Sequence, residues 1–157
     1  MLSVIALAVG MQLPASLVDY RLTMPNIRKM AAAYGRIDAA LVAKPALATS
    51  LTKAKGATSP EELMARFDND PIIRKAIAWA GLSTRDFVLT HLATVTTGMT
   101  ATAVQGGAKP PTAPAAVANL KLYKQNRAEI DRLMSELKKS PSLLAIGTES
   151  VDDDDDE

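Results

Sequence analysis

The chain contains no cysteine and only one histidine, His91. Without cysteine there can be no disulfide, thiolate zinc site, iron–sulfur cluster, thiol nucleophile or covalent c-type haem attachment. A single histidine excludes a multi-histidine metal site within one chain, and a Ser-His-Asp triad must use His91. No glycine-rich phosphate loop follows a strand pattern. We therefore expect a protein that is not an enzyme and that holds no metal or cofactor.

Aromatic residues are also scarce, at 4% of the 157 residues, although hydrophobic residues reach 48%. Alanine supplies much of that apolar content, which favours closely packed helices over a sheet of β-branched and aromatic residues. The length suits a single domain with a substantial core. The composition thus predicts an all-α protein.

Charge is distributed unevenly along the chain. Residues 149–157 carry seven acidic groups, so the other ten acids stand against all 18 Lys and Arg, which gives residues 1–148 a charge of 18 − 10, or +8. A basic body with an acidic tail is the result. We expect residues 140–157 to be a flexible solvating arm or to fold against a basic patch.

The N-terminus resembles an export signal. Residues 1–18 hold no charged residue until Asp19, and the apolar run from Leu2 to Leu13 has the length of a signal-peptide core but is short for a bilayer span. No Lys or Arg precedes the run, and the cleavage signal is imperfect. Three alternatives follow for residues 1–17: a cleaved export signal, an uncleaved anchor, or a buried segment of a cytosolic protein. The first two alternatives predict a periplasmic or secreted protein. In the second, the uncleaved N-terminal segment holds that protein at a membrane.

Helix signals dominate residues 18–139, the predicted helical body. Apolar residues at spacings of three and four indicate a helix that begins near Pro25 and ends at Lys44-Pro45. Capping signals at Ser59, Asp70 and Ser83 start three further helices. The first of these extends through Phe67, and the second ends at Gly81.

The helix after Ser83 has an unusual composition. Residues 87–108 contain no formally charged side chain if His91 is neutral, yet they include six Thr and three Gly. Val88, Leu92, Val95 and Met99 mark one face, whereas a second face is rich in Thr. The alternatives are a transmembrane helix and the central helix of a bundle, in which small side chains allow close approach and Thr hydroxyls bond back to carbonyl oxygens.

A last helix is predicted from about Pro114 to Lys139, after a loop rich in Pro and Gly at 106–115. The expected architecture is a helical bundle of three long and two short helices, with an apolar leader and an acidic tail.

Two motifs suggest metal or haem chemistry, and each has a simpler explanation. His91 and a methionine across the bundle have the residue types that ligate b-type haem, but methionine is a common core residue. Asp68-Asn69-Asp70 starts like a calcium loop but lacks the following Gly and the bidentate Glu. Asp70 is better explained as a helix cap. The methionines available in principle are Met24, Met30, Met64, Met99 and Met134.

The basic residues of the first and last long helices are the candidate partner-binding set. We expect them to form a positive face that favours an acidic protein surface or anionic lipid, and an export-like leader argues against nucleic acid. A solvated helix face is the simpler alternative. The set comprises Arg28, Lys29, Arg36, Lys121, Lys124, Arg127 and Arg132.

The segment GLSTRDF, residues 81–87, followed by a helix rich in Thr and Ala, resembles small exported helical proteins of bacterial envelopes. The resemblance covers about residues 18–139 and implies an export route and a helical fold, with no catalytic residues. The expected function is that of an accessory or scaffolding subunit of a larger envelope or membrane complex, such as an electron-transfer or light-harvesting complex. The alternative is a free periplasmic protein that binds a small apolar ligand between its helices.

Overall fold

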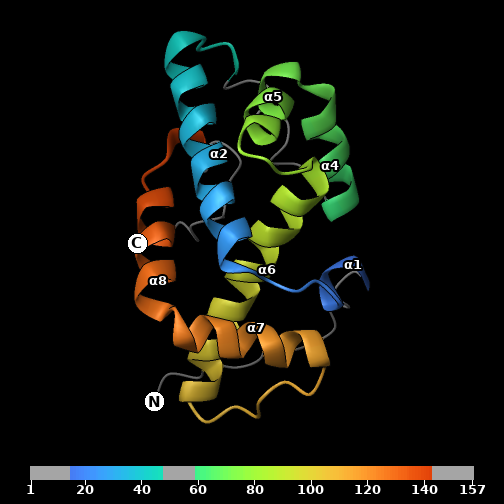
Figure 1. Ribbon diagram of the computed structural model, residues 1–157, viewed down its shortest axis with the longest axis vertical. Coiled ribbons are helices and arrows are strands. Elements are labelled where there is room, and N and C mark those ends of the chain that lie inside the picture. The colour runs from blue at the N-terminus through green and yellow to red at the C-terminus, as the bar shows by residue number, and fades with distance from the viewer. Residues whose placement is uncertain (1–14, 48–58, 143–157) are drawn as a thin grey trace, which may run out of the picture.

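The secondary structure is helical throughout the part of the chain that the structure describes. The computed structural model describes residues 15–47 and 59–142, and no strand occurs among them, which confirms the all-α class. Figure 1 shows the arrangement as a helical bundle. The helices are α1 (Ala15–Val18), α2 (Met24–Ala43), α4 (Pro60–Asn69), α5 (Pro71–Trp79), α6 (Thr84–Gln105), α7 (Pro114–Gln125) and α8 (Arg127–Leu137).

Side-chain caps fix where the helices begin. The hydroxyl oxygens of Thr23, Ser59 and Ser83 each accept a hydrogen bond from the backbone N–H three residues later, at 3.2, 3.1 and 2.9 Å. Oδ1 of Asp70 accepts from two N–H groups at the start of α5. Capping satisfies backbone donors that a helix leaves unpaired in its first turn. The predicted starts of α4, α5 and α6 are therefore confirmed.

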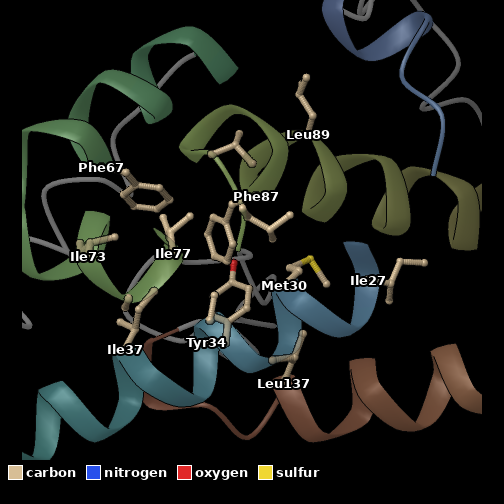
Figure 2. Packing of buried hydrophobic residues seen from close by; sticks show 14 of the residues in the cluster. Ile27, Met30, Tyr34, Ile37, Phe67, Ile73, Ile77, Phe87, Leu89 and Leu137 are labelled. Carbon is tan, nitrogen blue, oxygen red and sulfur yellow. The ribbon is translucent and has the colours of Figure 1, made fainter. Parts of the chain in front are cut away.

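The core forms between α2, α4, α5 and α6, where α5 and α6 each contact both α2 and α4. Ile27, Met30 and Ile37 of α2 are fully buried, as the apolar spacing predicts. Tyr34 points from α2 toward Phe87 of α6 with the ring centres 4.9 Å apart, and the ring centre of Phe67 of α4 is 6.0 Å from that of Phe87 (Figure 2). Aromatic pairs in tilted contact at these distances add to the area that they bury.

Helix α6 is the central helix of the bundle. It contacts α1, α2, α4, α5 and α7 (Figure 1). It is also the one helix among residues 15–47 and 59–142 that is long and apolar enough to span a membrane, a test that the core helix of a soluble protein passes as well.

The threonine side of α6 is buried along the helix, whereas the more apolar side is buried at Val88 and exposed at Met99. Thr90, Thr94 and Thr97 are buried, whereas Met99 on the more apolar side is 65% exposed. Oγ1 of Thr94 donates to the carbonyl oxygen of Thr90 at 2.7 Å, so the hydroxyl is satisfied within its own helix. Small side chains with internally bonded hydroxyls let neighbouring helices approach closely.

The prediction of a single last helix over residues 114–139 was wrong. The helix is interrupted at Asn126, which separates α7 from α8. The Asn126 side-chain amide donates to the carbonyl oxygen of Leu122 at 2.9 Å, and its backbone φ and ψ are −119° and 21°. Asn side chains compete with the backbone ladder in this way. Among residues 15–47 and 59–142 the bundle thus has two long helices, α2 and α6, rather than three, and α8 packs along α2.

The helical body extends slightly beyond 18–139. Leu17 of α1 is buried in the core, and Ser140 and Ser142 are buried against Asp38 of α2. Most of the expected leader 1–17 and acidic tail 140–157 falls in residues 1–14 and 143–157, which lie outside the described residues.

Candidate functional site

The only histidine packs beside the aromatic core. Nδ1 of His91 lies 3.3 Å from the hydroxyl oxygen of Tyr34, and the two rings are in tilted contact. Burial lowers the pKa of His91 to about 4 and raises the pKa of Tyr34. The imidazole is therefore neutral at physiological pH. Of the methionines considered as its haem partners, Met30 is a core residue and Met99 is exposed.

The carboxylates of the calcium-like motif serve the fold. Asp70 caps α5, as predicted, and Oδ1 of Asp68 accepts a 2.5 Å hydrogen bond from the hydroxyl of Thr84 at the start of α6. No group of three or more His, Asp or Glu side chains suitable for a metal ion occurs among the described residues.

The seven predicted partner-binding cations do not share one face. Arg28 makes a bidentate contact with Glu129 across α2 and α8, with N–O distances of 2.7 and 2.9 Å. Arg127 and Arg132 pair with Asp131 and Glu136 within α8. These three charges are locally balanced. Lys121 and Lys124 are exposed on α7, while Lys29 and Arg36 lie where α2 meets α5.

Lys29 and Arg36 belong to a surface that we call the Trp79 patch, defined by Lys29, Arg36, Lys75 and Trp79. The Arg36 guanidinium lies 3.5 Å from the centre of the Trp79 ring, and Trp79 is still 60% exposed. Nζ of Lys29 donates to the carbonyl oxygen of Gly81 at 3.2 Å, just beyond α5. Within the described residues, none of the three cations makes an ion pair.

Sequence reasoning missed Trp79 and Lys75, although a signal was present. The apolar stripe of α5 is carried by Ile73, Ala76 and Ile77, all buried. Trp79 follows Ile77 by two positions and so falls on the opposite side of the helix. A tryptophan that lies off the apolar stripe of a short helix is expected to be exposed to solvent.

Two hollows lie beside the C-terminal half of α6 in the described part of the chain. A groove of about 400 Å³ lies between α6, α7 and α8, with Val95, Met99, Met134 and Lys138 among its lining residues. A smaller pocket of about 130 Å³ lies between α1, α6 and α7. Its lining residues are Leu17, Val18, Ala93, Thr96, Thr97, Thr100, Ala113, Ala116 and Asn119.

Comparison of the chain with models of known protein families, with curated proteins and with solved structures gave no match. The resemblance to exported envelope proteins therefore remains a prediction from residues 81–87.

Proposed function

We propose that this protein is a non-enzymatic accessory or scaffolding subunit that docks through the Trp79 patch onto an acidic surface of a larger envelope complex. Its proposed location is the periplasmic or extracellular side of the membrane, as the export-like leader suggests. Electron-transfer and light-harvesting complexes are candidate hosts.

The observation that carries this proposal is the exposed tryptophan beneath an arginine. Trp and Arg are the residue types most enriched where truncation weakens protein–protein binding most. Here Arg36 keeps its charge unpaired within the described residues while it stacks on Trp79. An acidic side chain can bind Arg36 without displacing a resident carboxylate.

The state of His91 supports a role without acid–base catalysis. A general acid or base works best with a pKa near the operating pH. The pKa of about 4 makes His91 a poor proton carrier at neutral pH, and its Nδ1 already faces the hydroxyl of Tyr34. Packing alone accounts for the histidine.

The test is size-exclusion chromatography of mildly solubilised membranes with matched charge reversals. We expect the wild-type chain to migrate with a large complex and Arg36→Glu to release it. Lys124→Glu changes the charge equally on exposed α7 and should leave migration unchanged. Release by Lys124→Glu alone would move the interface to α7, and a small free wild-type species would refute the subunit role.

A lipid surface is the competing source of negative charge. Flotation with anionic phospholipid vesicles distinguishes a protein partner from a lipid surface. If the partner is a protein, the purified chain should not bind the vesicles at physiological salt. Vesicle binding that Arg36→Glu abolishes would assign the patch to a membrane instead and overturn the protein-partner proposal.

The second candidate function, binding of a small apolar ligand, is favoured by the 130 Å³ pocket. An apolar cavity of about 150 Å³ takes up benzene in another protein. A saturable rise in thermal stability with benzene, lost in Ala93→Leu, would support this alternative. Ala93 lines the pocket and is buried.

A further inference from the structure

The Trp79 patch combines one exposed aromatic ring with three cations that make no ion pair to any described residue. Lys29 and Arg36 are seven residues apart on α2, which places them two turns apart on one face. Lys75 precedes Trp79 by four residues on α5, so these two side chains are neighbours as well. The patch therefore has a charge of +3 around an indole, a surface suited to an acidic peptide.

The last described residues before the acidic segment lie against α2, the helix that carries Lys29 and Arg36. Oδ1 of Asp38 accepts from the hydroxyl of Ser140 at 2.8 Å and from the backbone N–H of Ser142 at 2.9 Å. Ser142 is the last described residue and is fully buried. These hydrogen bonds fix Ser140 and Ser142, which we call the root of the tail, to Asp38 of α2. Asp38 is two residues from Arg36 in the sequence.

Only the exposed side of α2 separates that root from the patch. Figure 1 shows α2 between α8 and α5. Asp38 bonds to Ser140 and Ser142, which follow α8, whereas Arg36 stacks on Trp79 of α5, so the two side chains lie on opposite flanks of α2. The exposed side carries small residues, Ala32, Gly35 and Ala39. A Cβ built on Gly35 meets nothing within 4 Å, so the surface there is open.

The length of the tail is sufficient for this crossing. Six residues, 143–148, precede Glu149, the first of the seven acidic groups. At about 3.3 Å per extended residue they span about 20 Å. A helix with its side chains is about 10 Å across, and α2 is lined with small residues on this side.

We propose that the acidic segment 149–157 binds the Trp79 patch of its own chain, across α2, and so competes with the partner. The competition rests on the proposed function, but the intramolecular contact does not. Individual surface ion pairs are weak, yet a tethered segment acts at an effective concentration on the order of millimolar. Several weak contacts then suffice to occupy the patch.

The first experiment uses Trp79 as its reporter, because it is the only tryptophan in the chain. A chain truncated after Thr148 keeps Ser140 and Ser142 and should fold like the full chain. We expect a synthetic peptide of residues 149–157, added to this truncated chain, to shift the fluorescence emission of Trp79 until binding saturates. Affinity should fall about tenfold or more between about 0.01 M and about 0.15 M salt, because the screening length shrinks from about 30 to about 8 Å. A peptide with Asn for Asp and Gln for Glu is the control, and an equal response to it would overturn the proposal.

The second experiment tests the contact in the full-length chain. Ala78→Cys beside Trp79 and Asp154→Cys in the tail place two thiols in a chain that has none. Ala128→Cys on exposed α8, combined with the same tail cysteine, gives the baseline for random collision. We expect disulfide formation within one chain to be about tenfold faster at position 78, and salt should abolish the difference.

The outcomes distinguish the two proposals. Equal crosslinking rates at positions 78 and 128 would refute tail docking, and crosslinking mainly between two chains would refute the intramolecular form. Both experiments use the isolated protein, so they stand apart from co-migration with a host. If the tail docks and a host exists, truncation after Thr148 should increase the bound fraction at low salt.

Discussion

Asn119 of α7 holds the extended segment between α1 and α2, because its Oδ1 accepts the backbone N–H of Leu22 at 2.8 Å. Its Nδ2 donates to the carbonyl oxygen of Tyr20 at 2.9 Å. One side chain thus satisfies a donor and an acceptor of a segment that lies about 100 residues earlier in the sequence. Both Asn119 and Leu22 are buried, so water cannot readily replace the amide.

We predict that Asn119→Ala lowers the free energy of unfolding by about 1–3 kcal/mol, because it leaves a buried N–H without its acceptor. Chemical denaturation of the variant measures the loss. Asn69→Ala, at the exposed end of α4, is the matched control and should change stability by less than about 0.5 kcal/mol. Equal effects of the two changes would contradict the bridging role.

The orientation of α6 gives the second prediction. Thr90 is fully buried and its hydroxyl lies 2.8 Å from that of Tyr20, so Thr90→Leu adds volume and removes a hydrogen bond. We expect a loss of about 1–3 kcal/mol. Met99→Ala on the exposed side should cost less than about 0.5 kcal/mol. The reverse ranking in thermal melts would contradict the burial of Thr90 and the exposure of Met99.

The third prediction concerns acid stability. Burial lowers the folded-state pKa of His91 to about 4, below its ordinary value near 6.5, so the unfolded chain binds more protons between these values. Stability should therefore decrease as pH falls through this window, by up to about 3 kcal/mol for the full shift.

Denaturation at pH 6.5 and pH 5 measures the histidine contribution before most carboxylates protonate. His91→Asn keeps a polar group near the Tyr34 hydroxyl but removes the titration. The variant should show a flatter dependence on pH than the wild type. An unchanged slope would assign the acid sensitivity to other groups.

The fourth prediction compares two arginines of α2. Arg28 is bound by Glu129 of α8, whereas Arg36 lies over Trp79. Arg28→Glu should loosen the contact of α8 with α2, and the double change Arg28→Glu with Glu129→Arg should restore it. Hydrogen exchange of α8 amides is the measurement, and Arg36→Glu should leave that exchange unchanged. Failure of the double change to recover protection would show that the pair is incidental.

Local patterns were sufficient to predict most helices but not their packing. The caps at Ser59, Asp70 and Ser83 and the stripe of α2 follow rules that involve only residues a few positions apart. The burial of Thr90 and the exposure of Met99 depend on which helices surround α6, which the periodicity of α6 alone does not contain.

The candidate site was harder to predict for a related reason. Positions on two predicted helices identified seven basic residues, but those positions could not show that Glu129, Asp131 and Glu136 balance three of them. The stacking of Arg36 on Trp79 joins residues 43 positions apart and appears only once α2 and α5 are packed.

The break at Asn126 has a consequence for how binding surfaces diverge. A straight helix would carry α8 past the end of the bundle, and the walls that Met134 and Val95 give to the groove would not face each other. A relative with alanine at this position could keep the composition, the charge and the apolar spacing and still present a different outline. A single change at this corner would therefore alter the shape of the groove while the residues that line it stay the same.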